Sequence, residues 1–109
     1  MIKVSVLYPN RPGSRFDVDY YLKVHMPMAA KLLAPALTAC SAEIGICGET
    51  PGSVPTYKAV AQFTCESVEA FLAALMPVAD QLQGDIPKYT DIEPIIQIGQ
   101  INEFQVSHS

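Results

Sequence analysis

Cysteine and histidine are scarce in this sequence of 109 residues. It contains three cysteines and two histidines, and no two cysteines stand at the C-x-x-C spacing of a zinc or redox motif. An odd number of cysteines fits no complete disulfide framework, so we expect three reduced and mostly buried thiols. His108 lies in a polar C-terminal tail, which leaves His25 without a second histidine for a metal site.

Phosphate-binding glycine motifs are also missing. Gly45, Gly48 and Gly52 form neither a G-x-G-x-x-G fingerprint nor a phosphate-binding loop. No pair of carboxylates lies near His25 in the sequence to complete a metal site. We therefore expect no metal and no cofactor; ligation of a haem by His25 is the one alternative that the residues leave open.

Positive charge and long apolar runs are lacking as well. Seven Lys and Arg against eleven Asp and Glu give a net charge of −4 without any basic run, which argues against nucleic acids and acidic membrane surfaces as partners. No segment is long and apolar enough to span a bilayer. The first six residues alternate like a strand and lack the apolar run of a signal peptide, so we expect a cytoplasmic protein.

Hydrophobic residues, in contrast, are abundant and make up 50% of the chain. A chain of this length forms one domain with its own core, so we expect a single domain over residues 1–109. Because so small a domain has little interior, part of the apolar surface should meet a partner chain.

Hydrophobic periodicity predicts six elements in the order β-α-β-β-α-β. Alternating patterns predict strands at residues 2–8, 39–48, 56–65 and 92–104, the second and third forming a hairpin. Helical patterns predict one helix from Asp17 to Pro35 and another from Ser67 to Gly84, followed by a loop at 85–91. This order is that of a ferredoxin-like α+β fold, in which two helices cover one face of a four-stranded antiparallel sheet.

The second face of such a sheet should carry apolar side chains. By alternation, the last strand places Ile96 and Ile98 on one side and Ile95 and Ile101 on the other. An apolar face without helices favours burial against a second copy, sheet against sheet. We therefore expect a homodimer, a dimeric α+β barrel, with a small-molecule pocket between the sheet and the helix-end loops.

His25 lies in the middle of the apolar face predicted for the first helix. Helical spacing places on this face Val18, Tyr21, Leu22, His25, Met28, Ala29, Leu32 and Leu33. Pro27 cannot donate a hydrogen bond to the carbonyl of Lys23, so we expect the helix to kink or restart beside His25. A histidine in a pocket can act as general acid or base; the alternative is a core histidine that bonds a neighbouring carbonyl.

Several short runs occur together along the chain. They are Tyr8-Pro9-Asn10, Phe16-Asp17, Tyr20-Tyr21, His25-Met26-Pro27, Asp85-Ile86-Pro87-Lys88-Tyr89-Thr90 and Pro94-Ile95-Ile96-Gln97-Ile98-Gly99. Together they span nearly the whole chain and resemble the EthD family of dimeric α+β barrel proteins, as a single EthD-like domain. One departure is Lys88, where an asparagine is more usual in the family.

The resemblance implies a protein that binds a small hydrophobic, oxygenated ring compound. The family is named for a protein required in bacterial ethyl tert-butyl ether degradation alongside a cytochrome oxygenase system. Similar folds include cofactor-free monooxygenases, muconolactone isomerases and polyketide dehydratases, which often use a helix-borne histidine. By this analogy His25 would be the catalytic acid/base of a cofactor-free oxidoreductase, isomerase or lyase. The alternatives are a non-catalytic accessory or carrier protein for a partner oxygenase, and a structural dimer with a filled barrel.

Six further residues are candidates for contact with the ligand: Tyr8, Tyr21, Phe63, Asp85, Tyr89 and Ile98. Tyr21 lies one turn before His25 and could bond a ligand oxygen or orient the imidazole, while Tyr8 could line the cavity at the end of the first strand. The alternative for both tyrosines is a core aromatic.

The remaining candidates come from the loop at 85–91 and from strands. The resemblance places Asp85 and Tyr89 near the pocket mouth, although Asp85 could simply cap a turn. Phe63 and Ile98 are expected as pocket walls. Tyr20 is expected to point elsewhere, toward the rim or an interface.

Overall fold

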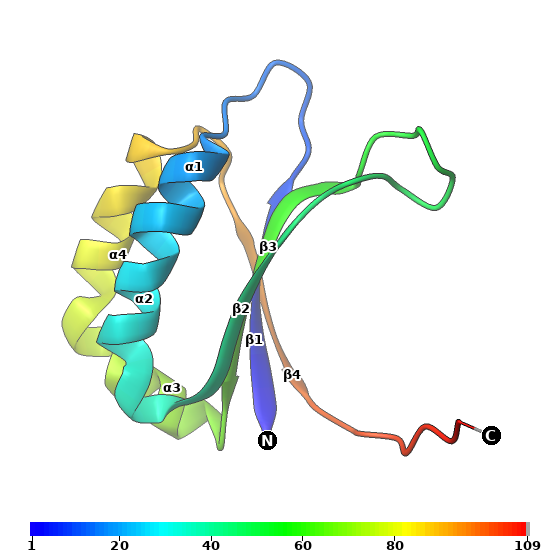
Figure 1. Cartoon of the computed structure of the whole chain (residues 1–109). Coiled ribbons are helices and arrows are strands. Elements are labelled where there is room, and N and C mark those ends of the chain that lie inside the picture. The colour runs from blue at the N-terminus through cyan, green and yellow to red at the C-terminus, as the bar shows by residue number, and fades with distance from the viewer. Residues whose placement is uncertain (109) are drawn as a thin grey trace.

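A four-stranded antiparallel sheet, covered on one face by helices, forms the body of the protein (Figure 1). The computed structural model describes residues 1–108. Its strands are β1 (Ile2–Pro9), β2 (Leu37–Ile44), β3 (Tyr57–Cys65) and β4 (Ile95–Gln100). They lie in the order β2-β3-β1-β4, and each neighbouring pair is antiparallel. The predicted α+β fold and βαββαβ order are confirmed.

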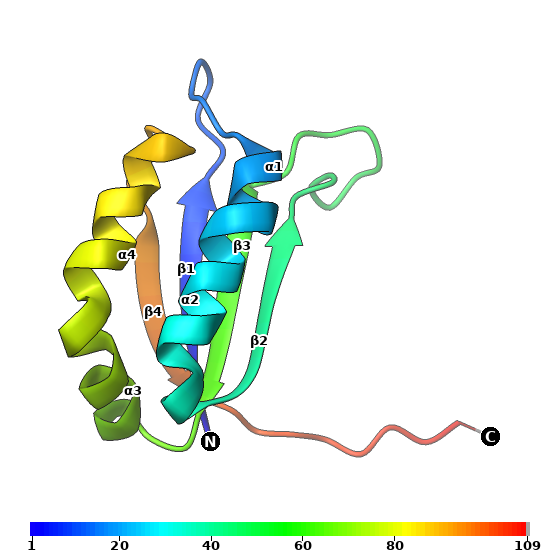
Figure 2. The ribbon, with the colours of Figure 1, turned by 60° about the vertical axis from the view of Figure 1, so that its left-hand side comes forward.

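Two helical segments pack on the same face of this sheet (Figure 2). The first consists of α1 (Val18–Tyr20), the π-helical turn η1 (Tyr21–His25), α2 (Met26–Leu33) and the 3₁₀ turn η2 (Ala34–Ala36). The second consists of α3 (Val68–Leu75), η3 (Met76–Val78), α4 (Ala79–Asp85) and η4 (Ile86–Lys88). Asp17 and Ser67 cap the two segments through their side chains, so each segment begins where the sequence predicts a helix to begin. None of the helices among the described residues has the length and apolar character needed to cross a membrane.

The first helical segment changes geometry beside Pro27, as predicted, but does so through a π turn. The amide of Met26 donates to the carbonyl of Tyr21, five residues back, which places one extra residue in this turn. The extra residue rotates the buried face. Met26 is therefore buried and Leu22 is 41% exposed, whereas helical spacing had placed Leu22 on the apolar face and left Met26 out.

Three predicted elements had wrong boundaries. β2 ends at Ile44 rather than 48, where Gly45 passes too close to the carbonyl of Tyr57 for a side chain. β4 covers 95–100 rather than 92–104, because Pro94 cannot donate to the ladder and Gln100 already pairs with the first residue of β1. The predicted loop at 85–91 begins as helix, since Asp85 ends α4 and η4 follows.

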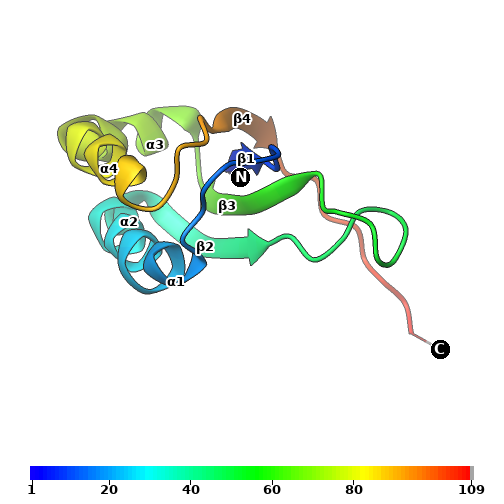
Figure 3. The same ribbon diagram turned by 90° about the horizontal axis from the view of Figure 1, so that it is seen from above.

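The core lies between the sheet and the helices. Val4 and Tyr8 of β1 and Phe63 and Cys65 of β3 point toward the helices and are buried there. The opposite face of the sheet carries no helix among the described residues, as the view from above shows (Figure 3). The two faces of β1 therefore differ: one contributes to the core and the other is uncovered in a single chain.

Candidate functional site

A cavity of about 330 Å³ lies between the sheet and the two helical segments. Only Tyr8, His25 and Gln83 among its sixteen lining residues have a polar side-chain group, and none has a charged carboxylate, ammonium or guanidinium. Leu72, Ile96 and Ile98 line the cavity and are also exposed, so it meets solvent between α3 and the edge strand β4. An apolar cavity with few polar groups is the usual form of a small-molecule site.

His25 is the titratable group on the cavity wall, and its ring is tied to a buried carboxylate. His25 and Asp85 are each 7% exposed, and the His25 Nδ1 lies 2.9 Å from the Asp85 Oδ2. An ionised carboxylate only accepts hydrogen bonds, so Nδ1 is the donor and the neutral ring carries its lone pair on Nε2. Within residues 1–108 nothing forms a hydrogen bond with Nε2, which leaves this nitrogen for a ligand.

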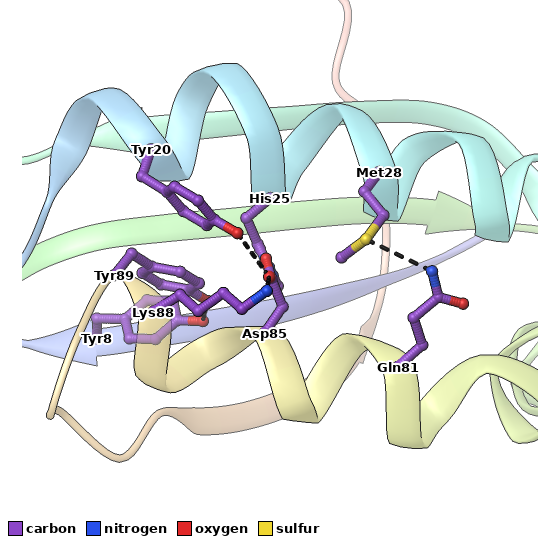
Figure 4. A network of polar contacts seen from close by, with 8 residues as sticks. All are labelled: Tyr8, Tyr20, His25, Met28, Gln81, Asp85, Lys88 and Tyr89. Carbon is purple, nitrogen blue, oxygen red and sulfur yellow. Dashed lines mark hydrogen bonds and ion pairs between the residues drawn. The ribbon is translucent and has the colours of Figure 1, made fainter.

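Two hydrogen-bond donors, Tyr20 and His25, and the ammonium of Lys88 surround the Asp85 carboxylate (Figure 4). The Tyr20 hydroxyl donates to Oδ1 at 2.7 Å, and the Lys88 Nζ lies 3.7 Å from the same oxygen. Burial alone would raise the pKa of Asp85, but the hydrogen bonds from Tyr20 and His25 and the nearby positive charge outweigh it and lower the pKa below its ordinary value. Asp85 is thus not simply a turn cap, and the prediction that Tyr20 points away from the site was wrong.

A cluster of tyrosines lies behind the histidine. The hydroxyls of Tyr8 and Tyr89 are 2.6 Å apart, and the ring of Tyr89 lies 4.6 Å from that of His25 between centroids. Tyr21 stacks on His25 with 13° between the ring planes, and its buried hydroxyl has no hydrogen-bond partner in the described chain. Burial raises the pKa of both Tyr21 and Tyr89, so these phenols stay protonated at neutral pH.

Backbone contacts between two distant segments bring Asp85 and Tyr89 to His25. The amide of Asp17 donates to the carbonyl of Tyr89 at 2.7 Å, and the Thr90 hydroxyl donates to the carbonyl of Arg15 at 2.7 Å. The guanidinium of Arg15 in turn donates to the carbonyl of Pro87 at 2.8 Å. These bonds join the start of the first helical segment to the end of the second, which sets the ring of His25 against the Asp85 carboxylate.

The structure divides the predicted site residues into two groups. Tyr8, His25, Phe63 and Ile98 line the cavity. Tyr21, Asp85 and Tyr89 lie behind its wall, each in contact with the His25 ring. Their direct contact with a ligand stays a prediction.

Sequence reasoning missed two contributors to the site. Tyr20 and Lys88 both contact the Asp85 carboxylate. No local signal reveals Tyr20, because the π turn alters the helical phase that periodicity assumes. In addition, Phe71 and Leu75 of the second helical segment line the cavity, although neither is among the predicted site residues. Among residues 1–108, no three His, Cys, Asp or Glu side chains gather in a way that could hold a metal ion.

Comparison with known proteins points to one family. Residues 14–93 match the model of the EthD domain. The crystal structure of an EthD-like protein from Ralstonia eutropha JMP134 is 41% identical, with 91% of this chain and 89% of that chain covered and a TM-score of 0.86. None of the curated proteins matches the chain.

Two more distant structures share the fold alone. An ethyl tert-butyl ether degradation (EthD) family protein from Bacillus halodurans C-125 is 17% identical, covering 94% of this chain and 99% of that chain, with a TM-score of 0.72. A protein from Arabidopsis thaliana is 14% identical, covering 97% and 100%, with a TM-score of 0.68.

Proposed function

This chain belongs to the EthD family, and from that premise we propose that it binds a small hydrophobic, oxygenated compound and moves a proton on it with His25. The observation that carries the proposal is the buried pair of His25 and Asp85, which presents an imidazole to an apolar cavity. A positioned base of this kind contributes about 10²- to 10⁴-fold to a proton transfer.

Asp85 supports this chemistry in two ways. Its bond to Nδ1 keeps the lone pair of His25 on Nε2, and its negative charge stabilises the imidazolium that forms when Nε2 takes a proton. The apolar walls limit the number of water molecules around the reacting atoms, which strengthens both effects. Isomerisation and dehydration need only such proton transfers, whereas a cofactor-free oxidation also needs dioxygen as co-reactant.

A carrier role is the second candidate. Thirteen of the sixteen cavity-lining residues have no polar side-chain group, which is enough to hold a hydrophobic compound without any reaction. Such a protein would deliver its ligand to a partner oxygenase. Binding would then survive the loss of the His25 imidazole, and no turnover would be found in the purified protein.

Deuterium uptake by 2-tetralone separates the two functions. This uncharged ketone has an acidic C–H beside its carbonyl, so proton transfer appears in NMR spectra as exchange in deuterium oxide. We expect the wild type to accelerate exchange by about 100-fold or more over buffer, His25→Gln to lose the acceleration, and His108→Gln in the exposed tail to keep it. Binding without acceleration would favour the carrier, and no binding at all would refute both roles.

A homodimer is the assembly that we propose for this chain. On the uncovered face Leu7 pairs with both Val60 and Ile95, which forms an apolar stripe across three strands, and Ile95 is 51% exposed. A second copy, sheet against sheet, would bury the exposed end of this stripe at Ile95, whereas Val60 is only 7% exposed in the single chain. Sedimentation should therefore give a dimer for the wild type and a monomer for Ile95→Glu, while Gln97→Glu on the same face serves as a control for the added charge. A monomeric wild type would contradict the proposal.

A further inference from the structure

The paired hydroxyls of Tyr8 and Tyr89 leave one proton without an acceptor. The two oxygens lie 2.6 Å apart, and either can be the donor. Each hydroxyl has a single proton, so one bond between them uses only one of the two. No other hydrogen bond to either hydroxyl occurs in the described chain. The second proton must therefore point from one of these oxygens toward something else.

Burial decides which tyrosine has the free proton. Tyr89 is fully buried and does not line the cavity, whereas Tyr8 does. If Tyr8 were the donor, the proton of Tyr89 would be sealed in the interior without an acceptor, which is costly. If Tyr89 donates to Tyr8, the free proton belongs to the residue that borders the cavity. Burial raises the pKa of Tyr8 above its ordinary value, so its hydroxyl stays protonated at neutral pH and keeps a proton to donate.

We propose that the Tyr8 hydroxyl donates a hydrogen bond to the carbonyl oxygen of an uncharged ligand, whose neighbouring C–H is the acid that His25 deprotonates. This inference rests on the proposed role of His25 and names the substrate class for it. Besides the exposed Gln83, the polar side chains on the cavity wall are Tyr8, which supplies a donor, and His25, whose Nε2 supplies an acceptor. A ketone with an acidic C–H matches both, because it has one strong acceptor and one removable proton.

The absence of a lining cation excludes anionic ligands. None of the sixteen cavity-lining residues is Lys or Arg. The nearby Lys88 does not line the cavity and already forms an ion pair with Asp85 behind its wall. A carboxylate buried without a cation is strongly disfavoured. The ligand is therefore an uncharged carbonyl compound rather than a carboxylic acid.

The reaction step balances with these groups alone. Nε2 of His25 takes the proton from the carbon beside the carbonyl. The electron pair of that C–H bond forms a carbon–carbon double bond, and the carbonyl π pair moves to the oxygen. The Tyr8 O–H stabilises the resulting enolate oxygen, with Tyr89 donating to Tyr8 from behind. The imidazolium then exchanges its Nε2 proton with solvent and returns one to the same carbon, which gives exchange. When the enolate is conjugated with a further carbon–carbon double bond, return of the proton to the far carbon of that system gives isomerisation.

The test compares Tyr8→Phe with the wild type on two probes of similar shape, 2-tetralone and its oxygen-free analogue tetralin. We expect Tyr8→Phe to bind tetralin normally, to bind 2-tetralone about tenfold more weakly, and to slow deuterium exchange by about 100-fold. The infrared carbonyl stretch of bound 2-tetralone should lose the downward shift that it has in the wild type. Tyr57→Phe, which changes a tyrosine outside the cavity, should match the wild type.

Three results would overturn the inference. The first is a carbonyl stretch and affinity unchanged in Tyr8→Phe. The second is a downward shift of the carbonyl stretch that persists in Tyr8→Phe and vanishes in Tyr89→Phe, which would assign the donor to Tyr89. If Tyr8→Phe fails to fold, Tyr89→Phe alone decides the question, because the inference predicts that this variant keeps the shift. The third concerns charge: 2-naphthoate binding as tightly as its neutral analogue 2-acetylnaphthalene would refute the exclusion of anions.

These outcomes are distinct from a failure of the proposed function. If exchange in the wild type equals that in His25→Gln while the carbonyl shift still depends on Tyr8, the proton-transfer function is wrong and Tyr8 remains the ligand's donor. If exchange depends on His25 but not on Tyr8, the function stands and the inference fails.

Discussion

Replacing Asp85 by Asn should damage both the stability of the protein and the basicity of His25. Two donors face the carboxylate, the Nδ1–H of His25 at 2.9 Å and the Tyr20 O–H at 2.7 Å. An asparagine has one acceptor oxygen and one NH₂ group, so it can satisfy only one of these donors. The other donor would face an NH₂ group, or His25 would shift its proton from Nδ1 to Nε2.

The size of the expected stability loss follows from the hydrogen bonds that Asp85→Asn removes. A hydrogen bond to a charged group contributes about 1.5–3 kcal/mol, and a buried donor left without an acceptor costs a further 1–3 kcal/mol. Relaxation of Tyr20, which is only half-buried, recovers part of this cost. We expect Asp85→Asn to lower the free energy of unfolding by about 2–4 kcal/mol. Asp80→Asn, an exposed substitution in the same helix α4, should change it by less than about 0.5 kcal/mol.

The stability difference between wild type and Asp85→Asn should depend on pH in a definite direction. The pKa of Asp85 in the folded state is lower than in the unfolded state, so its stabilising contribution is complete above the unfolded pKa, about 3.9, and is lost as the pH falls through the folded value. Urea denaturation should therefore show a larger difference between wild type and Asp85→Asn at about pH 7 than at about pH 3. An equal difference at both pH values would refute an ionised Asp85.

Nitrogen NMR of the histidine ring checks the expected effect of Asp85→Asn on the basicity of His25. In the wild type the proton of neutral His25 should be on Nδ1, and in Asp85→Asn on Nε2, where it removes the lone pair from the cavity. Exchange of 2-tetralone should then fall by about 10²- to 10⁴-fold. A variant that keeps full exchange with its proton on Nε2 would show that His25 is not the base.

Three further substitutions probe the surroundings of the site. Tyr21→Phe removes a buried hydroxyl without a partner, so thermal unfolding should show unchanged or higher stability, by up to about 1 kcal/mol; a clear loss would reveal a missed partner of this hydroxyl. Tyr20→Phe removes a donor to Asp85 and should raise the pKa of that carboxyl toward its ordinary value, seen by NMR titration of its carboxyl carbon; no change would mean that the bond does not form in solution. Ala29→Leu places extra methyl groups in the cavity and should weaken tetralin binding at a cost in stability of about 1–3 kcal/mol, whereas Ala30→Leu, outside the cavity, should leave binding intact; equal effects would place the ligand elsewhere.

Local signals in the sequence were sufficient for the order and type of the elements. Side-chain caps at Asp17 and Ser67 act within three residues, and alternation along β1 depends only on which side chains are apolar. The ends of strands were less predictable, because a strand ends where its neighbour does. Nothing near Gln100 marks the end of β4; the reason is that β1 begins at Ile2, its partner in the ladder.

In the candidate site, too, local signals predicted some features and tertiary contacts decided the others. Periodicity and Pro27 identified His25 as a buried, titratable group beside an irregular turn, and four of the seven predicted site residues line the cavity. The helical phase was misjudged after Tyr21, because periodicity assumes a regular α-helix and the π turn adds a residue. As a result, the role of Tyr20 was missed.

The sequence alone determined that a histidine would be buried in an α+β domain, since burial follows from the spacing of apolar residues along one helix. It did not determine what the imidazole would touch. Asp85 lies 60 residues away and reaches His25 only because the two helical segments pack on one face and Arg15, Asp17 and Thr90 join their ends. The tertiary structure decided the pairing, because the properties of a buried acid or base depend on the groups within a few ångströms and not on its neighbours along the chain.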